Sequence, residues 1–122
     1  MQPSLIRIFL AAAILIGIGI FGIYGYTQLG KISCKARGGS WGKIGSYSGE
    51  SCNLPTSDAG KECSGFNECE GACIAELSKE DLGKAMRRVV LYTKGKCTAW
   101  KITVGCQPFV EDGKVDGLLC VD

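Results

Sequence analysis

The sequence predicts a small disulfide-rich domain, mainly short β-strands and turns with one short α-helix, behind one N-terminal transmembrane helix. Two observations carry this prediction. A run of 19 uncharged residues, 8–26, lies near the N-terminus of the 122-residue chain, and all eight cysteines follow it. Such a cysteine density is typical of small exported domains that are stabilised by disulfides. We therefore expect a membrane anchor at 1–30 and an exported disulfide-rich domain at 31–122.

The apolar run is long enough to cross a bilayer. As a helix it measures about 28 Å, close to the hydrocarbon thickness of a membrane. Arg7 precedes it, and Tyr24 and Tyr26 lie where interfacial aromatic residues are expected. A cleavable signal has an apolar core of about 7–15 residues and a small-x-small cleavage site, which 25–27 imitates poorly. We favour an uncleaved anchor that contacts the lipid bilayer through residues 8–26, with a cleaved signal as the alternative.

Two signals for membrane topology disagree. Disulfides persist in oxidising compartments, so the cysteines place the C-terminal domain in the periplasm or outside the cell. The positive-inside rule would place it in the cytoplasm, because more positive side chains follow the run than precede it. Those that follow are Lys31, Lys35, Arg37 and Lys43. We give the cysteines more weight, because eight reduced thiols would need a metal site that their spacing does not supply.

The eight cysteines are expected to form four structural disulfides. Their number is even, and no two are separated by only two residues, so the CxxC pattern of zinc knuckles and redox disulfides is missing. We expect neither a metal ion nor a cofactor. Of the 105 possible connectivities we favour the pairs Cys34–Cys52, Cys63–Cys73, Cys69–Cys97 and Cys106–Cys120. Four bridges contribute about 8–16 kcal/mol, comparable to the net stability of a typical domain, so reduction should unfold the protein.

The first half of the exported region is expected to be mostly turns. Residues 38–49 contain five glycines and predict turns and short extended pieces around Trp41 and Tyr47. Residues 53–73 are rich in turn formers around three cysteines and predict an irregular loop.

Capping and charge patterns in the sequence predict one helix. Ser78, with Asp81 three residues later, predicts the N-cap of a helix that runs from about 79 to 88. Acidic residues fall in its first turn, and Arg87 and Arg88 fall in its last turn, as the helix dipole favours.

Two hairpins are expected after the helix. Residues 89–93 predict a strand, 94–96 a turn, and 97–104 a second strand with alternating apolar residues. The turn residues at 111–114 predict another hairpin. A two-residue Asp-Gly turn would set Cys106 opposite Leu119, whereas a three-residue loop would set it opposite Cys120.

Charge and composition exclude several classes of function. A net charge of +2 gives no sign of a basic surface that would bind nucleic acid. The absence of His excludes His-dependent catalysis and His-ligated metal sites. The acidic pairs, at 68/70, 80/81 and 111/112, lie in turns or at a helix start, where carboxylates are common for local reasons. We therefore expect no enzymatic activity. Four aromatic residues are candidates for a protein interface, although two or three of them are expected to fill the core: Trp41, Tyr47, Phe66 and Trp100.

Several short motifs resemble a group of short exported bacterial cysteine-rich proteins of unknown function. They are GSWG at 39–42, CNLPTSDAGKEC at 52–63, CEGAC at 69–73, GC at 105–106 and LCVD at 119–122. The resemblance covers most of residues 34–122 and implies an exported scaffold behind an apolar N-terminus. It assigns no functional residues.

The leading functional hypothesis is a membrane-anchored extracytoplasmic module, stabilised by disulfides, that binds a protein partner or supports an envelope structure. The domain would then be the periplasmic or extracellular part of a single-pass membrane protein. The alternative is a freely secreted inhibitor, toxin or signalling domain released by signal cleavage. A third hypothesis is an enzyme or metal-binding protein.

Overall fold

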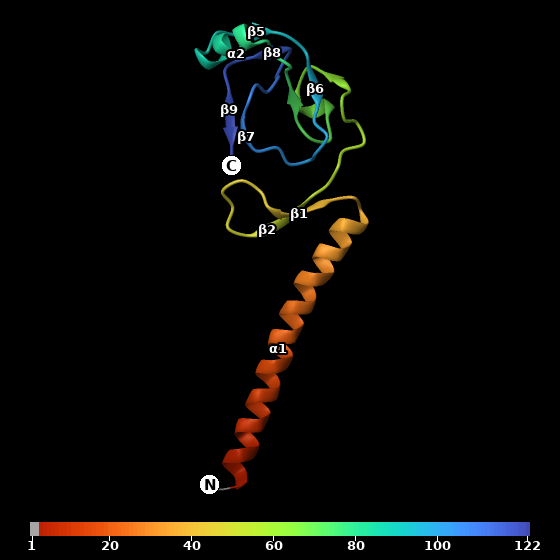
Figure 1. The fold of residues 1–122 in the computed structure, drawn as a ribbon, viewed down its shortest axis with the longest axis vertical. Coiled ribbons are helices and arrows are strands. Elements are labelled where there is room, and N and C mark those ends of the chain that lie inside the picture. The colour runs from red at the N-terminus through yellow and green to blue at the C-terminus, as the bar shows by residue number, and fades with distance from the viewer. Residues whose placement is uncertain (1–2) are drawn as a thin grey trace. The chain divides into compact units, whose positions relative to one another are not determined.

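A computed structural model describes residues 3–122 (Figure 1). It confirms the predicted fold class, since it contains one long apolar N-terminal helix, a short second helix, short antiparallel strands and four disulfides. The chain divides into two compact units, of which the first ends at Ser33 and the second comprises Cys34–Asp122. The division falls three residues after the boundary expected between 30 and 31.

Helix α1 (Pro3–Ala36) has 34 residues and extends ten residues beyond the apolar run. Gly38 accounts for where it ends. The φ angle of Gly38 is 72°, its N–H donates to the Lys35 carbonyl at 3.0 Å, and the Gly39 N–H donates to the Cys34 carbonyl at 2.9 Å. These two bonds form a Schellman motif, in which glycine takes the left-handed conformation that stops a helix.

The second unit contains a three-stranded antiparallel sheet. Its central strand is β6 (Gly95–Cys97), which pairs with β3 (Glu62–Cys63) on one side and β4 (Cys73–Ile74) on the other. A short 3-10 helix, η1 (Phe66–Glu68), lies in the segment between β3 and β4. The expected irregular loop at 53–73 thus also contains β3 and η1.

The other strands form three antiparallel pairs, each of two short strands. They are β1 (Ser40–Lys43) with β2 (Glu50–Asn53), β5 (Leu91–Tyr92) with β8 (Lys114–Val115), and β7 (Gly105–Gln107) with β9 (Leu119–Val121).

Helix α2 (Lys79–Met86) begins as the sequence predicts. The Ser78 hydroxyl accepts the Asp81 N–H at 3.1 Å, which satisfies one of the free donors at the helix start. The helix ends two residues before the expected position, because Arg88 takes a left-handed conformation with φ 57°.

The first predicted hairpin after α2 is wrong. Residues 94–96 do not form a turn, since β6 begins at Gly95. Residues 98–104 form no strand and make a single isolated bridge, between Trp100 and Pro55. Backbone groups of this segment instead bond to the segment 54–72, with the Lys101 N–H donating to the Leu54 carbonyl at 3.0 Å. The predicted strand 89–93 shortens to β5, which pairs with β8.

The C-terminal hairpin combines the two expected geometries. Asp112 and Gly113 form a two-residue turn with φ angles of 50° and 71°, and a bridge joins Glu111 to Lys114. Cys106 nevertheless pairs with Cys120, because the returning segment contains one additional residue. Gly117, with φ 87°, lies in that segment.

The buried core of the second unit is small. Its members are Cys63, Cys73, Ala75, Ala85, Cys97, Val110 and Val115. Three of these seven are half-cystines, so disulfides provide much of the interior that a larger domain would build from aliphatic side chains.

Candidate functional site

The structure pairs all eight cysteines in the favoured connectivity, and none is free. The disulfides are Cys34–Cys52, Cys63–Cys73, Cys69–Cys97 and Cys106–Cys120. The first links the last turn of α1 to β2, and the last joins two directly paired residues of β7 and β9.

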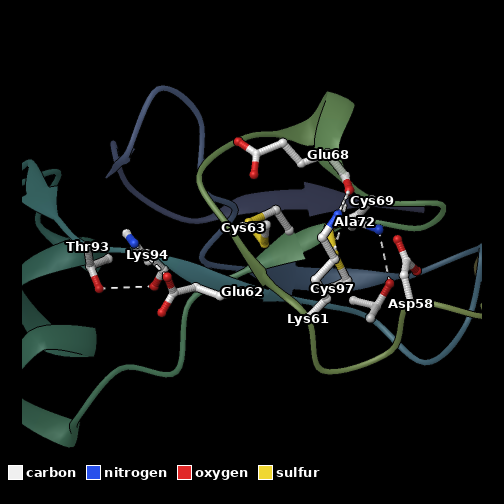
Figure 2. Close-up of a disulfide and its surroundings, with 12 residues drawn as sticks. Asp58, Lys61, Glu62, Cys63, Glu68, Cys69, Ala72, Thr93, Lys94 and Cys97 are labelled. Atoms are coloured by element: carbon white, nitrogen blue, oxygen red, sulfur yellow. Dashed lines mark hydrogen bonds and ion pairs between the residues drawn. A yellow bond between two sulfur atoms is a disulfide. The ribbon is translucent and has the colours of Figure 1, made fainter.

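Two disulfides lie side by side at the three-stranded sheet. The sulfur atoms of Cys63, Cys69 and Cys97 all lie within 4.8 Å of one another, and Figure 2 shows these residues together. Such a group has the spacing of a metal site, but metals bind the thiolate form of cysteine. Each of these sulfurs is bonded to a second sulfur, to Cys73 in one bridge and within the Cys69–Cys97 pair in the other. The cluster therefore cross-links the sheet.

The four bridges differ in their access to solvent. Cys63, Cys73 and Cys97 are each at most 3% exposed. Cys106 and Cys120 are both exposed on the β7–β9 pair. A soluble reductant thus reaches the β7–β9 bridge directly and the Cys63–Cys73 bridge only after the core opens, whereas the half-buried Cys69 gives the Cys69–Cys97 bridge intermediate access.

The β1–β2 hairpin carries two of the four interface candidates. The indole N–H of Trp41 donates to Glu50 Oε2 at 2.8 Å across the hairpin, and Trp41 is half-buried. Tyr47 lies in the connecting loop and is 71% exposed.

The other two candidates, Phe66 in η1 and Trp100 in the segment after β6, are exposed. The expectation that two or three of the four aromatic residues fill the core is wrong. The physical reason is the small size of the core, whose seven buried members are all half-cystines, alanines or valines. Among residues 3–122, the one aromatic pair is Phe66 with Phe109, whose ring centroids lie 5.5 Å apart. The structure therefore does not join the four candidates through ring contacts.

The Phe66–Phe109 pair forms part of a surface pocket of about 340 Å³. The remaining side chains that matter for its chemistry are charged: Glu111, Asp112, Lys114 and Asp116. The sequence predicts only a turn for Glu111 and Asp112, and it signals no role for Phe109 at the site.

Long-range backbone hydrogen bonds assemble this pocket. The Gly113 N–H donates to the Ser64 carbonyl at 2.8 Å, and the Val110 N–H donates to the Cys73 carbonyl at 2.9 Å. These bonds hold the segment that carries η1 against the Asp-Gly turn. No local pattern in the sequence signals these contacts, because the paired residues lie 49 and 37 positions apart.

The pocket has a net negative charge. The ion pairs among residues 3–122 are formed by Lys84, Lys94 and Lys96 with acidic residues outside the pocket. None of the three pocket carboxylates takes part in these pairs, and Lys114 is the one cation among the pocket residues.

Two other carboxylates are held in their charged form. Hydrogen bonds from the hydroxyl and the N–H of Ser57 lower the pKa of Glu70. Hydrogen bonds from Lys84 and from Ser78 lower the pKa of Asp81. A general acid at neutral pH needs a raised pKa, so both shifts run against that role.

Comparisons with known proteins place no further constraint on this site. The resemblance to exported cysteine-rich proteins rests on the sequence motifs alone. No protein-family model, curated protein or solved structure matches the chain.

Proposed function

We propose that the protein is a membrane-anchored binding module whose disulfide-bonded domain lies outside the cytoplasm. The observation that carries this proposal is the complete pairing of eight cysteines in the unit that follows a membrane-length helix. Structural disulfides form and persist in the periplasm and outside the cell, and they are rare in the cytosol. This argument outweighs the positive charges that follow the apolar run.

The exposure of α1 supports the anchor. The helix is long and apolar enough to cross a membrane, and none of its apolar window is buried within the protein. Leu15 is 70% exposed and Phe21 is 80% exposed. Apolar surface of this extent needs a lipid or protein environment. An N-terminal signal sequence shares these properties, which is why a secreted domain is the competing function.

The surface of the domain supports binding rather than catalysis. Five of the six residues in the candidate acidic pairs are exposed, Asp81 is half-buried, and the perturbed carboxylates have lowered pKa values. Exposed aromatic side chains and a pocket are features of recognition surfaces.

Intact mass and membrane fractionation separate the anchored protein from the secreted one. We expect the full chain in the membrane fraction, and loss of the first 25–30 residues would instead establish secretion. Ile16→Arg places a charge at the centre of the apolar run, where insertion costs about 2.5–3.5 kcal/mol, and should deplete the membrane fraction. Ile32→Arg, in the same helix but outside the run, is the matched control and should leave the fraction unchanged.

Thiol labelling in intact cells tests the topology. A membrane-impermeant maleimide should label the protein only after treatment with a membrane-impermeant reductant. Thiols that are free in native material, or that react only when the reagent enters the cytosol, would overturn the extracytoplasmic assignment.

A further inference from the structure

We propose that the pocket between η1 and the Asp-Gly turn binds an arginine side chain of a partner protein. The inference rests on the proposed function, because it identifies the chemistry of the partner that the extracytoplasmic module would bind. Three properties of the pocket carry it: its aromatic surface, its charge and its size.

The aromatic surface suits a planar cation. The rings of Phe66 and Phe109 lie 5.5 Å apart with an interplanar angle of 32°, and Phe66 remains 37% exposed. A guanidinium group stacks on aromatic faces and is attracted by the negative potential of the ring. The guanidinium group is also weakly hydrated, so it loses less hydration free energy than an ammonium group when it leaves water.

The charge of the pocket is complementary to the same group. Glu111 and Asp112 belong to the turn, and Asp116 follows β8 on the returning segment. These three exposed carboxylates oppose one cation, Lys114, and form no ion pair within residues 3–122. An arginine that enters the pocket finds carboxylate acceptors whose geometry its planar fork can match.

A neighbouring cation of the chain itself forms no ion pair with the pocket carboxylates. The side chain of Arg88 passes beside Gly117, since a Cβ atom on Gly117 would lie 3.6 Å from Arg88 Cγ. Arg88 nevertheless forms no ion pair with the pocket carboxylates. Those carboxylates therefore remain available to a partner.

The size and rigidity of the pocket favour a single side chain. Ligand pockets span about 300–1,000 Å³, and this one, at about 340 Å³, is at the small end. Its walls are tied together by the Gly113–Ser64 hydrogen bond and by the Cys63–Cys73 bridge, which closes the segment that carries Phe66. Preformed walls reduce the ordering cost of binding.

Titration of the full chain in zwitterionic detergent micelles tests the proposal. The probe is N-acetyl-arginine-N-methylamide, and the readout is the set of backbone amide shifts in a ¹⁵N-labelled sample. We expect saturable shifts at Phe66, Phe109 and Asp112. The citrulline analogue, which has the same shape without the charge, should produce no saturable shift, and the lysine analogue should bind more weakly than arginine.

Substitutions at the pocket test whether its charge determines the affinity for arginine. Glu111→Gln and Asp116→Asn should each weaken arginine binding about 1.5- to 5-fold, the range for one exposed charge pair. Lys114→Gln should strengthen it by a similar factor, because it removes the competing cation. Glu80→Gln, an exposed acid on α2 outside the pocket, is the control and should have no effect.

Equal binding of the citrulline or lysine analogue, no saturable shift at the pocket, or weaker binding by Lys114→Gln would overturn the proposal. These outcomes concern the purified protein alone. They leave the fractionation and labelling results untouched, so a failure here is distinguishable from a failure of the proposed function.

Discussion

Gly95 lies in the central strand β6, where neighbouring atoms leave no room for a side chain. A Cβ atom there would lie 2.8 Å from the Ile74 carbonyl oxygen and 2.9 Å from Cys73 Sγ. Both neighbours belong to the cross-linked sheet, so neither moves away at low cost. We expect Gly95→Ala to lower the free energy of unfolding by about 1–3 kcal/mol, as overpacking of a core does. Denaturant unfolding of the full chain in micelles, with the disulfides intact, measures this change.

Gly42, in β1, is the matched control. A Cβ atom at this position meets no atom within 4 Å. Gly42→Ala should therefore cost no stability and should raise the free energy of unfolding by up to about 1 kcal/mol, because alanine lowers the entropy of the unfolded chain. A loss as large as that of Gly95→Ala would contradict the steric explanation.

The hydrogen-bonded carboxyl of Glu70 should make the folding stability of the protein depend on pH in the acidic range. Ser57 holds its pKa below the ordinary value of 4.5. A carboxyl whose pKa is lower in the folded state contributes stability above its unfolded pKa and loses it as the pH falls through the folded value. Glu70→Gln should therefore reduce the melting temperature at pH 6 and have a smaller effect at pH 2.5, measured by thermal unfolding.

Ser57→Ala provides an independent check on the same pH dependence. It removes the hydroxyl donor to Glu70, so the melting temperature should change less with pH in the same acidic range. Ser48→Ala, in the β1–β2 loop, should leave the profile unchanged. A Glu70→Gln profile parallel to that of the wild type at every pH would refute the assignment.

At the scale of whole elements, the two helices end in the same motif with different residues. In α1 the left-handed position is Gly38, whereas in α2 it is Arg88. The bonds match, since the Arg88 and Val89 N–H groups donate to the Ala85 and Lys84 carbonyls at 2.9 and 3.0 Å. Arg88→Gly relieves about 1–2 kcal/mol of backbone strain in the folded state. It also costs about 0.5–1 kcal/mol, because glycine raises the conformational entropy of the unfolded chain. We expect a net stabilisation of about 0.5–1 kcal/mol in denaturant unfolding.

Arg87→Gly separates backbone strain from charge. Arg87 has φ −90° and ψ 12°, so glycine relieves nothing there, although the same positive charge is lost. This variant should be less stable than the wild type by about 0.5–1 kcal/mol. Stabilisation by both variants would mean that charge, rather than conformation, is responsible.

The elements that the sequence predicts correctly depend on local chemistry. The cap at Ser78 and the Asp-Gly turn at 112–113 are interactions between residues close in the chain. The predicted strand 97–104 fails because its alternating pattern specifies no partner. The Cys69–Cys97 bridge draws that segment to the loop at 54–72, whose backbone groups then replace a hairpin strand. Tertiary pairing overrides β propensity in such short segments.

The candidate site shows the same division between local and long-range information. The sequence marks Phe66 as an interface candidate, because aromatic side chains are enriched in protein interfaces. It signals neither Phe109 nor the acidic side of the pocket, because the bonds that join η1 to the hairpin connect Ser64 with Gly113. Disulfide pairing was predictable where a hairpin set the register, as for Cys106 and Cys120.

At the scale of the whole molecule, two bridges that close loops of similar length should contribute unequally to stability. Cys106–Cys120 spans 14 residues and Cys63–Cys73 spans 10, so each contributes about 3 kcal/mol through loop entropy. Replacing both cysteines of the exposed bridge by alanine should cost about that amount. The same change at the buried bridge also removes two core side chains, which adds about 1–3 kcal/mol for the cavity. Denaturant unfolding of the two double variants measures the difference.

When the native protein is reduced step by step, the exposed disulfide should open before the buried one. Thiol–disulfide exchange requires the attacking thiolate to reach a sulfur atom. Cys106 and Cys120 are exposed, whereas Cys63 and Cys73 are at most 1% exposed. Increasing dithiothreitol, followed by alkylation and peptide mass analysis, should therefore show Cys106–Cys120 open first, while near-UV circular dichroism remains native. The Cys63–Cys73 bridge should open only together with global unfolding. If the buried bridge were reduced first, the core could not depend on its half-cystines in the way the structure indicates.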